Sequence, residues 1–236
     1  MKGDGVIPED EISGMAQGSV PPVFTIGHST RSIPAFVELL RAGGVEQVVD
    51  IRKVPRSRAN PQYNGDVMSS ELAPFQIAYR RTEALGGLRR KSPVPPETNG
   101  LWRNQSFHNY ADYALSEPFR LGLSELLDMA ADRRTAIMCA EAVWWRCHRR
   151  IVADYLIRAG RRVFHLMGEK QIVEAALTPG GQPCADGLHY PAEGAAKDQA
   201  DKPAPSAAIP LCKHEREAAG ENARHARARR GDTPPG

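Results

Sequence analysis

Short apolar segments of strand length alternate along the chain with stretches whose apolar residues recur at helical spacing. The expected strands are residues 23–26, 45–51, 77–81, 135–139 and 162–166. Helical faces are predicted within residues 33–40, 119–130 and 151–159, with a short helix at 69–73. This alternation is typical of βαβ units. It predicts an α/β fold with a single doubly wound, mostly parallel sheet of about five strands and helices on both faces.

The domain is expected to occupy residues 23–177, and a hydrophobic content of 41% is enough for its core. Residues 1–22 have no hydrophobic period and are predicted to form a flexible leader. From residue 178 to 236 the chain is rich in Pro, Gly and Ala and ends in a basic stretch. We expect a disordered tail there.

The compartment is predicted from what the sequence lacks. No run approaches the roughly 18 to 20 apolar residues that cross a membrane, and residues 1–20 lack the apolar segment of a signal peptide. We therefore expect a cytoplasmic protein without a membrane partner. In that reducing compartment its four cysteines are expected to be free thiols.

Positive charge is concentrated in one segment of a chain whose net charge is only +3. Between Arg52 and Arg103 there are ten Lys or Arg residues and four acidic ones. Such a surplus favours anionic partners. An anionic small molecule or a nucleic acid is the expected partner, and no oligomeric state is predicted.

Chemically versatile residues follow several of the expected strands. In doubly wound sheets, ligands bind beyond the carboxyl ends of the strands. His28 follows the first strand, Asp50 lies at the end of the second, and Cys139 and Glu141 follow the fourth. These four residues are therefore the predicted catalytic groups.

Cys139 lies in the segment IMCAEAVWWRCHRR, residues 137–150, where a helix N-terminus and nearby Arg would lower a thiol's pKa. The arrangement resembles rhodanese-like and phosphatase sites in its logic. It departs from the phosphatase loop, because six residues separate Cys139 from Arg146 and the bulky residues 143–145 would cradle a phosphate poorly. A buried structural thiol is the alternative for Cys139, and Cys147 is expected mainly to pack.

Glu141 offers a different chemistry, because a carboxylate beside aromatic rings can act as nucleophile or acid/base at a glycosidic carbon. The alternative is a salt bridge with Arg149 or Arg52. No cofactor is predicted. A metal held by Cys139, Glu141, Cys147, His148 or His28 is a further option, although no paired metal-binding motif is present.

Two further groups of residues complete the expected site. Arginines and a hydroxyl that would grip an anion are Arg52, Arg56, Ser57, Arg58, Arg103 and Arg149. Other residues expected to line the pocket are Ser29, Asn64, Gly86, Gly87, Trp102, Trp145 and His148.

Five separated blocks resemble a known family. They are TIGHSTRS, VDIRKVPRSRANPQYN, LGG, NGLWRNQSFHNYADYALSEPF and MCAEAVWWRCHRRIVADYL. In order and approximate spacing they are similar to the bacterial family called domain of unknown function 488, over about residues 23–167. The resemblance implies a compact α/β domain, and the family's name assigns no reaction. The leader and the tail lie outside it.

Three functions remain open from the sequence. We favour an enzyme, a Glu- or Cys-dependent transferase or hydrolase, that acts on a phosphorylated, nucleotide or nucleic-acid-derived substrate. The alternatives are a non-catalytic nucleic-acid or nucleotide-binding module and a cysteine-based transferase resembling rhodanese-like sites. An enclosed pocket containing Glu141 and Cys139 would favour an enzyme. An open basic groove, with these side chains buried in ion pairs, would favour the binding module.

Overall fold

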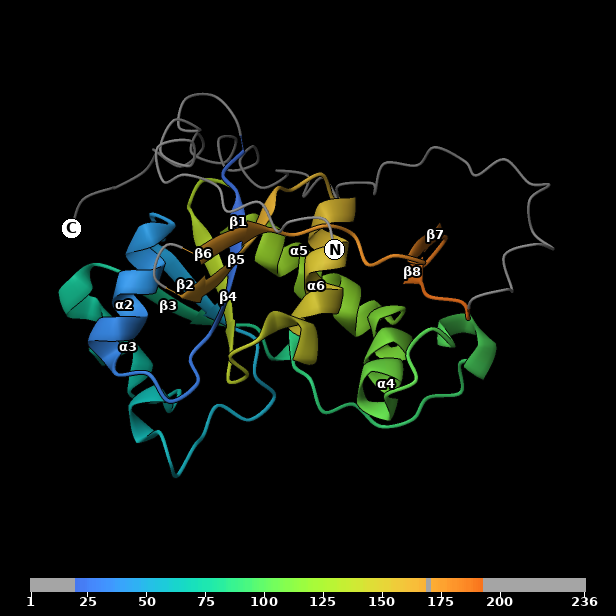
Figure 1. Ribbon diagram of the computed structural model, residues 1–236, viewed down its shortest axis with the longest axis horizontal. Coiled ribbons are helices and arrows are strands. Elements are labelled where there is room, and N and C mark those ends of the chain that lie inside the picture. The colour runs from blue at the N-terminus through green and yellow to red at the C-terminus, as the bar shows by residue number, and fades with distance from the viewer. Residues whose placement is uncertain (1–19, 169–170, 193–236) are drawn as a thin grey trace, which may run out of the picture. The chain divides into compact units, whose positions relative to one another are not determined.

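The computed structural model describes residues 20–168 and 171–192. Within them, helices and strands alternate as Figure 1 shows. The strands are β1 (Val23–Gly27), β2 (Gln47–Asp50), β3 (Ala78–Arg81), β4 (Thr135–Cys139), β5 (Val163–Gly168), β6 (Gln171–Glu174), β7 (Gln182–Cys184) and β8 (Gly187–His189). The α-helices are α2 (Ile33–Ala42), α3 (Met68–Leu72), α4 (Gln105–Ala114), α5 (Glu117–Met129) and α6 (Arg149–Arg158). Short 3-10 helices are η1 (Pro61–Tyr63), η2 (Ala73–Phe75), η3 (Glu83–Leu85), η4 (Pro96–Asn99) and η5 (Trp144–Arg146).

Among the described residues, six strands form the central sheet in the order β3-β2-β4-β1-β5-β6. The first five are mutually parallel, and β6 pairs antiparallel with β5. The predicted α/β sheet is therefore confirmed, with one more strand at its edge. β4 lies between β2 and β1, whereas β5 lies on the other side of β1, so the strand order reverses beside β1 and β4.

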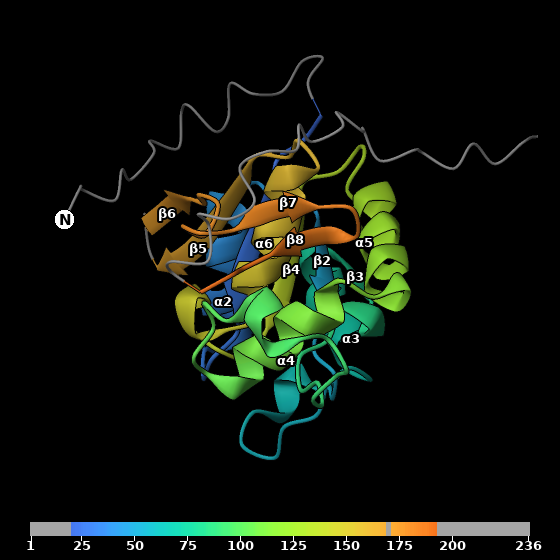
Figure 2. The ribbon, with the colours of Figure 1, turned by 90° about the vertical axis from the view of Figure 1, so that its right-hand side faces the viewer.

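Helices cover both faces of the sheet (Figures 1 and 2). Helices α2 and α3 pack on one face, and α4, α5 and α6 pack on the other. The side chains of β4 show why two cores form. Ile137 points to the face covered by α4, α5 and α6, and its neighbours Ala136 and Met138 point to the face covered by α2 and α3. The inner strands β1, β2 and β4 are thus buried on both sides, as is typical of parallel sheets.

Local signals explain where α2 begins and ends. The Ser32 hydroxyl accepts a hydrogen bond from the Ala35 amide at the first turn. Gly44, which has a φ of +59°, follows the last turn, and only glycine adopts this backbone conformation without strain. Both features agree with the helix predicted from the sequence.

Helix α4 is not among the helices predicted from the sequence. The Asn104 side chain caps it by accepting hydrogen bonds from two amides of its first turn. The helix buries Tyr110, Ala111 and Ala114 in the core that it shares with α5 and α6 on one face of the sheet. Its apolar residues Phe107, Tyr110, Ala111 and Ala114 fall at the 0, 3, 4, 7 spacing of one helical face, a signal that the prediction from the sequence missed.

The composition of the chain predicts disorder from Thr178 onward, and the structure corrects that boundary. Residues 178–192 form the hairpin β7–β8 and the segments around it, which lie beside α6 (Figure 2). The Tyr155 hydroxyl donates to the Leu188 carbonyl, and the Tyr190 hydroxyl donates to the buried Asp154 carboxylate. Residues 178–192 have too few apolar side chains to form a core of their own, so these contacts with α6 stabilise their fold. Residues 1–19 of the predicted leader and 193–236 of the predicted tail lie outside the described residues.

No helix in residues 20–168 or 171–192 is both long and apolar enough to cross a membrane.

Candidate functional site

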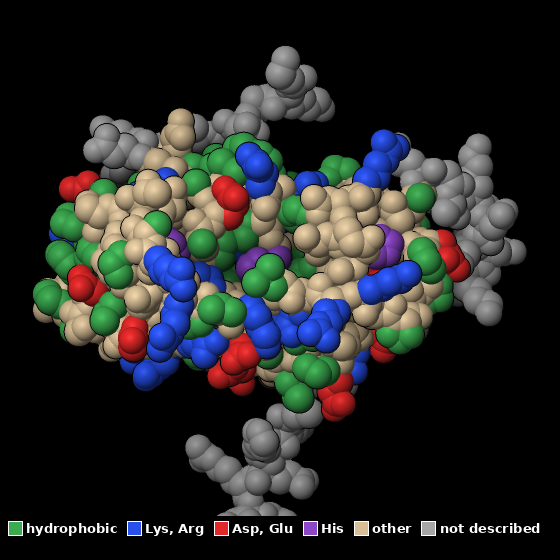
Figure 3. Space-filling model, turned by 90° about the horizontal axis from the view of Figure 1, so that it is seen from below, with side chains coloured by type: hydrophobic (Ala, Val, Ile, Leu, Met, Phe, Trp, Pro, Cys, Tyr) green, Lys and Arg blue, Asp and Glu red, His purple; other side chains and the backbone are tan. Residues whose placement is uncertain are grey.

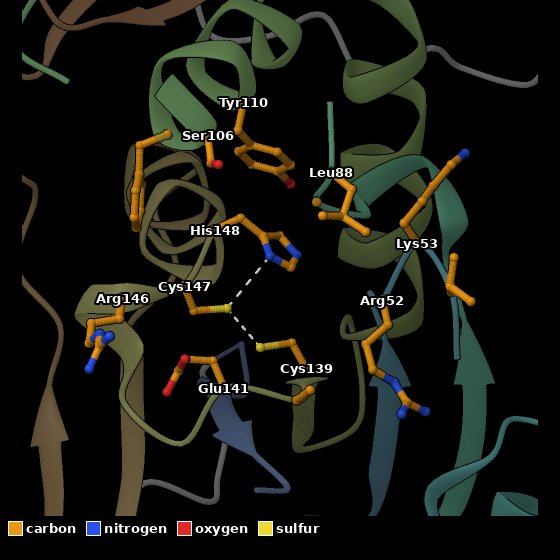
Figure 4. A pocket seen from close by; sticks show the side chains of 14 residues that line it. Arg52, Lys53, Leu88, Ser106, Tyr110, Cys139, Glu141, Arg146, Cys147 and His148 are labelled. Atoms are coloured by element: carbon orange, nitrogen blue, oxygen red, sulfur yellow. Dashed lines mark hydrogen bonds between the residues drawn. The ribbon is translucent and has the colours of Figure 1, made fainter. Parts of the chain in front are cut away.

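A cavity of about 330 Å³ opens beyond the carboxyl ends of β2 and β4. This edge is the point of strand-order reversal where doubly wound sheets bind ligands, and the volume suits a small molecule. The lining residues come from the loops after β2, β3 and β4 and from α4; they are Arg52, Lys53, Val54, Gly87, Leu88, Ser106, Phe107, Tyr110, Cys139, Ala140, Glu141, Arg146, Cys147 and His148. Figure 4 shows ten of them labelled.

The wall of the cavity contains a cysteine–histidine pair. The Cys147 Sγ lies 3.5 Å from His148 Nδ1, and His148 Nε2 lies 3.2 Å from the Ile51 carbonyl oxygen. Because a carbonyl only accepts hydrogen bonds, Nε2 must carry a proton, which leaves Nδ1 of the neutral ring free to accept the thiol proton. In this tautomer His148 Nδ1 is positioned to accept a proton from Cys147.

Cys139 adds a second thiol to this pair, with its Sγ 2.7 Å from the Cys147 Sγ (Figure 4). Burial opposes ionisation of Cys147. The hydrogen bond from Cys139, the interactions with His148 and the charge of Arg149 outweigh it, so the pKa of Cys147 lies well below its ordinary value. Burial and the interaction with Cys147 instead raise the pKa of Cys139 well above its ordinary value. These directions favour Cys147 as the thiolate of the pair, with Cys139 as the donor to it.

Two structural elements hold the cysteines in place. Cys139 is the last residue of β4, and Cys147 precedes the first turn of α6, whose N-cap is His148. The positive end of a helix dipole stabilises a nearby anion. From the sequence, this electrostatic help is expected at Cys139, whereas the structure places Cys147 nearest to the helix.

Arg149 and Gly27 hold the loop between the two cysteines in place. The buried Arg149 guanidinium donates from Nη2 to the Glu141 and Ala142 carbonyl oxygens. Gly27 permits the close approach of the same loop, because a Cβ atom there would lie 1.8 Å from the Glu141 carbonyl oxygen. Any larger residue at position 27 would force β1 and this loop apart.

A glycine pair shapes the opposite wall. A Cβ atom on Gly86 would lie 2.9 Å from the Lys53 backbone, and one on Gly87 would lie 2.9 Å from His148 Nδ1. The Tyr110 hydroxyl donates to the Leu85 carbonyl, and its ring lies 5.0 Å from that of His148. The LGG segment and α4 therefore confine the imidazole beside Cys147.

Asp50 lies behind the cavity, not at its surface. Its carboxylate is fully buried and accepts hydrogen bonds from the Arg52 backbone and guanidinium and from the Tyr79 hydroxyl. Arg52 extends this network to His28, whose Nε2 accepts from Nη1 at 3.2 Å. His28 Nδ1 therefore donates to the Ser29 carbonyl.

His28 is also buried, and it does not line the cavity. Burial, opposed by the bond to Ser29 and reinforced by the Arg52 charge, lowers the pKa of His28 to about 4. Its ring stacks on Tyr63 at 4.2 Å. Of the four predicted catalytic residues, only Cys139 and Glu141 reach the cavity, and Asp50 and His28 support Arg52 behind it.

The predicted anion-binding residues are dispersed. Arg52 lines the cavity, although its guanidinium is bound to Asp50. Arg56, Arg58 and Arg103 are exposed outside it, and Arg149 is buried beneath the loop that follows β4. Figure 3 shows Lys and Arg side chains across this face, around a hollow in which histidine is visible. Sequence reasoning missed Lys53 and Arg146, which line the cavity directly beside predicted residues.

The remaining predicted pocket residues have mixed placements. Gly87 and His148 line the cavity, and Gly86 packs against Lys53 just behind it. The Asn64 side chain accepts from the Ser57 amide and so shapes the loop after β2. Residues outside the lining are Ser29, Trp102 and Trp145, of which Trp102 is buried against Phe107 and Tyr190.

The Glu141 carboxylate is exposed at the cavity wall. The salt bridge with Arg149 or Arg52, which was the alternative to a chemical role for Glu141, is not formed, because Arg149 binds the Glu141 backbone carbonyl and Arg52 binds Asp50. Within the part of the chain that the structure describes, no group of three or more His, Cys, Asp or Glu side chains is arranged to hold a metal ion.

Comparison with known proteins identifies the family of the chain. The family model described as Domain of unknown function DUF488 matches residues 32–156, which is just over half of the chain. No curated protein and no solved structure matches it. The matched segment contains Asp50, Arg52, both cysteines and His148, and it begins beyond His28. The resemblance seen in the sequence blocks is confirmed: the chain belongs to the family of Domain of unknown function DUF488.

Proposed function

We propose that this protein is a cysteine-dependent enzyme in which Cys147 is the nucleophile and His148 is its acid/base partner. One observation carries the proposal: His148 Nε2 faces the Ile51 carbonyl while Nδ1 faces the Cys147 Sγ, at the wall of a cavity. A thiol beside an oriented base is the arrangement that activates a nucleophile. This favours the cysteine-based alternative from the sequence, with the roles of Cys139 and Cys147 exchanged.

The geometry supports a two-step group transfer. The Cys147 thiolate attacks the electrophilic atom of the substrate, and the leaving group departs with the proton from His148 Nδ1. An acceptor, water or a second substrate, then attacks the covalent intermediate. His148 takes the acceptor's proton, and Cys147 leaves as a thiolate. The Glu141 carboxylate lines the same cavity and is our candidate to orient the acceptor.

The proposed substrate is a small anion with an apolar or aromatic part, which includes the phosphorylated and nucleotide-derived molecules expected from the charge pattern. Arg146 supplies positive charge at the cavity, whereas the ammonium of the lining residue Lys53 is paired with Glu83 at 2.7 Å. Leu88, Phe107 and Tyr110 supply apolar surface. A cytoplasmic location, as the sequence suggests, would keep the thiols reduced.

The non-catalytic binding module is less well supported. An enclosed pocket containing Cys139 and Glu141 is the sign of an enzyme expected from the sequence; both residues line the cavity, which is partly open to solvent. The carboxylate of Glu141 is not buried in an ion pair with either predicted arginine. The exposed arginines of this face fit a role in attracting anions to the cavity.

The first test measures ionisation of Cys147. The full chain carrying Cys184→Ala and Cys212→Ala is alkylated with iodoacetamide from pH 5 to 10, and modification is followed by peptide mass spectrometry. We expect the rate at Cys147 to reach half its maximum well below the value of about 8.5 that is typical of a free thiol. The variant His148→Gln should raise that midpoint, because the base is removed. An unshifted midpoint would contradict the proposed activation.

The second test measures turnover on a panel of phosphate esters, nucleotides, activated acyl esters and thiosulfate. Loss of general acid/base help in His148→Gln is expected to slow turnover about 100-fold. Cys147→Ser should abolish it and prevent accumulation of a covalent intermediate. Turnover that survives Cys147→Ser would refute the proposal, and the folded variant Cys139→Ser is the matched control for changing a neighbouring thiol.

A further inference from the structure

The two cysteines form an asymmetric pair at the cavity wall. Their sulfur atoms lie 2.7 Å apart, so a small approach would bring them to the length of about 2.0 Å of a disulfide bond. They come from opposite ends of the loop between β4 and α6, and both line the cavity (Figure 4).

The surroundings give the two thiols different roles. Cys147 contacts His148 Nδ1 and lies at the start of α6, with the buried Arg149 two residues further on. Cys139 lies at the end of β4, and its hydrogen-bonding side-chain partner is Cys147. In thiol oxidation, a stabilised thiolate is attacked by the oxidant, and a neighbouring protonated thiol then resolves the product. Cys147 fits the first role and Cys139 the second.

Burial of the pair limits which oxidant can reach it. Cys139 is 3% exposed and Cys147 is 5% exposed. To react with a disulfide on another protein, the thiolate must approach one sulfur in line with the S–S bond that breaks. The burial of both cysteines opposes that approach by a large partner. A small hydroperoxide can enter a cavity of about 330 Å³. The geometry therefore favours a hydroperoxide.

We propose that Cys147 and Cys139 together reduce a small hydroperoxide and end as a reversible disulfide. This second activity rests on the Cys147 thiolate of the proposed function, but not on the group transfer itself. Because the disulfide consumes the nucleophile, it also switches the group transfer off until the thiols are regenerated.

Each chemical step balances in atoms and electrons. The Cys147 thiolate attacks the terminal oxygen of the hydroperoxide, the O–O bond breaks, and the departing alkoxide takes the proton from His148 Nδ1 to give an alcohol. Cys147 is now a sulfenic acid. The Cys139 sulfur attacks the Cys147 sulfur, the S–O bond breaks, and hydroxide leaves with the Cys139 proton as water. An external dithiol then reduces the disulfide and is itself oxidised.

The first experiment uses the full chain with Cys184→Ala and Cys212→Ala, reduced and then mixed with one equivalent of hydrogen peroxide. Trypsin cleaves after Arg146, between the two cysteines, so a disulfide joins two peptides that are separate after reduction. We expect that linked species, with a loss of two hydrogen atoms per chain, and its disappearance with dithiothreitol. Failure to form the linked species under these conditions overturns the inference.

Single variants separate the two roles. Cys139→Ser should stop at the Cys147 sulfenic acid, which dimedone traps. Cys147→Ser should consume peroxide only at the background rate, because Cys139 lacks an activating base. Circular dichroism and thermal melting check that each variant is folded. Trapping of the sulfenic acid mainly on Cys139 in the parent chain would overturn the assignment of roles.

The outcomes also distinguish this inference from the proposed function. Turnover of a substrate that depends on Cys147, without disulfide formation, overturns the inference alone. A reversible disulfide without group transfer on any substrate in the panel supports the inference and counts against the proposed function. If both occur, adding peroxide should abolish group transfer and dithiothreitol should restore it. Retained transfer in a fully oxidised sample overturns the switch.

Discussion

Replacing Asp50 by asparagine should destabilise the domain without disabling the Cys147 thiolate. The change keeps the size of the side chain and removes its charge. Asp50 is fully buried and is bound to the Arg52 guanidinium, which is itself only 6% exposed. Arg52 cannot shed its proton, so Asp50→Asn leaves a buried positive charge without a counterion.

The size of the expected loss of stability follows from the burial of this ion pair. Removing one partner of a buried ion pair typically costs about 3 to 5 kcal/mol. For a domain of this size, each kcal/mol lowers Tm by about 2 to 4 °C, so Asp50→Asn should lower Tm by about 6 to 20 °C. The matched control is Asp186→Asn, because Asp186 is 71% exposed and lies 3.6 Å from Arg120. Breaking such an exposed pair should cost about 1 kcal/mol or less.

The assay is urea unfolding of the full chain, with iodoacetamide alkylation of the folded protein in parallel. Arg52→Met added to Asp50→Asn should recover part of the lost stability, because the unpaired charge is gone. The alkylation midpoint of Cys147 should stay in place. If Asp50→Asn were no more destabilising than Asp186→Asn and yet abolished turnover, Asp50 would be a catalytic residue and our placement of it behind the site would be refuted.

Three other changes test the site and its supports. Gly87→Ala places a methyl group against the imidazole of the pair, so it should raise the alkylation midpoint of Cys147 in a folded protein; an unchanged midpoint would contradict the close packing of Gly87 on His148. Tyr190→Phe removes the hydrogen bond to buried Asp154 and should cost about 1.5 to 3 kcal/mol in urea unfolding; no loss would mean that residues 178–192 do not support the domain. Burial and then the Arg149 charge lower the pKa of His165 to about 3 from the ordinary 6.5. Between these values only the unfolded chain takes up this proton, so the free energy of unfolding should fall as pH drops below 6.5, by up to about 1.4 kcal/mol per pH unit. That contribution should be missing from the pH series of His165→Gln, and an identical slope would contradict it.

The sheet was predictable because its inner strands β1, β2 and β4 are buried on both faces. Apolar runs of strand length, separated by segments with helical periodicity, leave few arrangements other than a parallel sheet covered by helices. The same pattern predicted that residues 139 and 141 lie at the carboxyl edge of the sheet. The hairpin β7–β8 escaped prediction because its stability comes from contacts with distant residues, such as Tyr155 against Leu188, and not from local periodicity. In α4 the periodic apolar residues from Phe107 to Ala114 were a local signal that the prediction missed.

The chemistry of the site depended on tertiary structure. The sequence placed Cys139, Glu141, Cys147 and His148 in one short segment. It did not show that the carbonyl of Ile51, on the chain after β2, fixes the tautomer of His148. The ranking of the two cysteines also reversed, because the pKa of a thiol depends on burial and on charges brought near it by folding. Asp50 and His28, which the sequence suggested as catalytic residues, instead contact Arg52 behind the cavity.

By itself, then, the sequence determined the family, the α/β architecture and the edge of the sheet at which reactive side chains gather, because hydrophobic periodicity and motif order are properties of the chain alone. Only the tertiary structure decided which of those side chains meet. Hydrogen-bond direction, burial and electrostatic pairing act over a few ångströms between residues far apart in sequence. Those short-range interactions place Cys139 and His148 against Cys147, and they support our proposal that Cys147 is the thiolate and His148 its base.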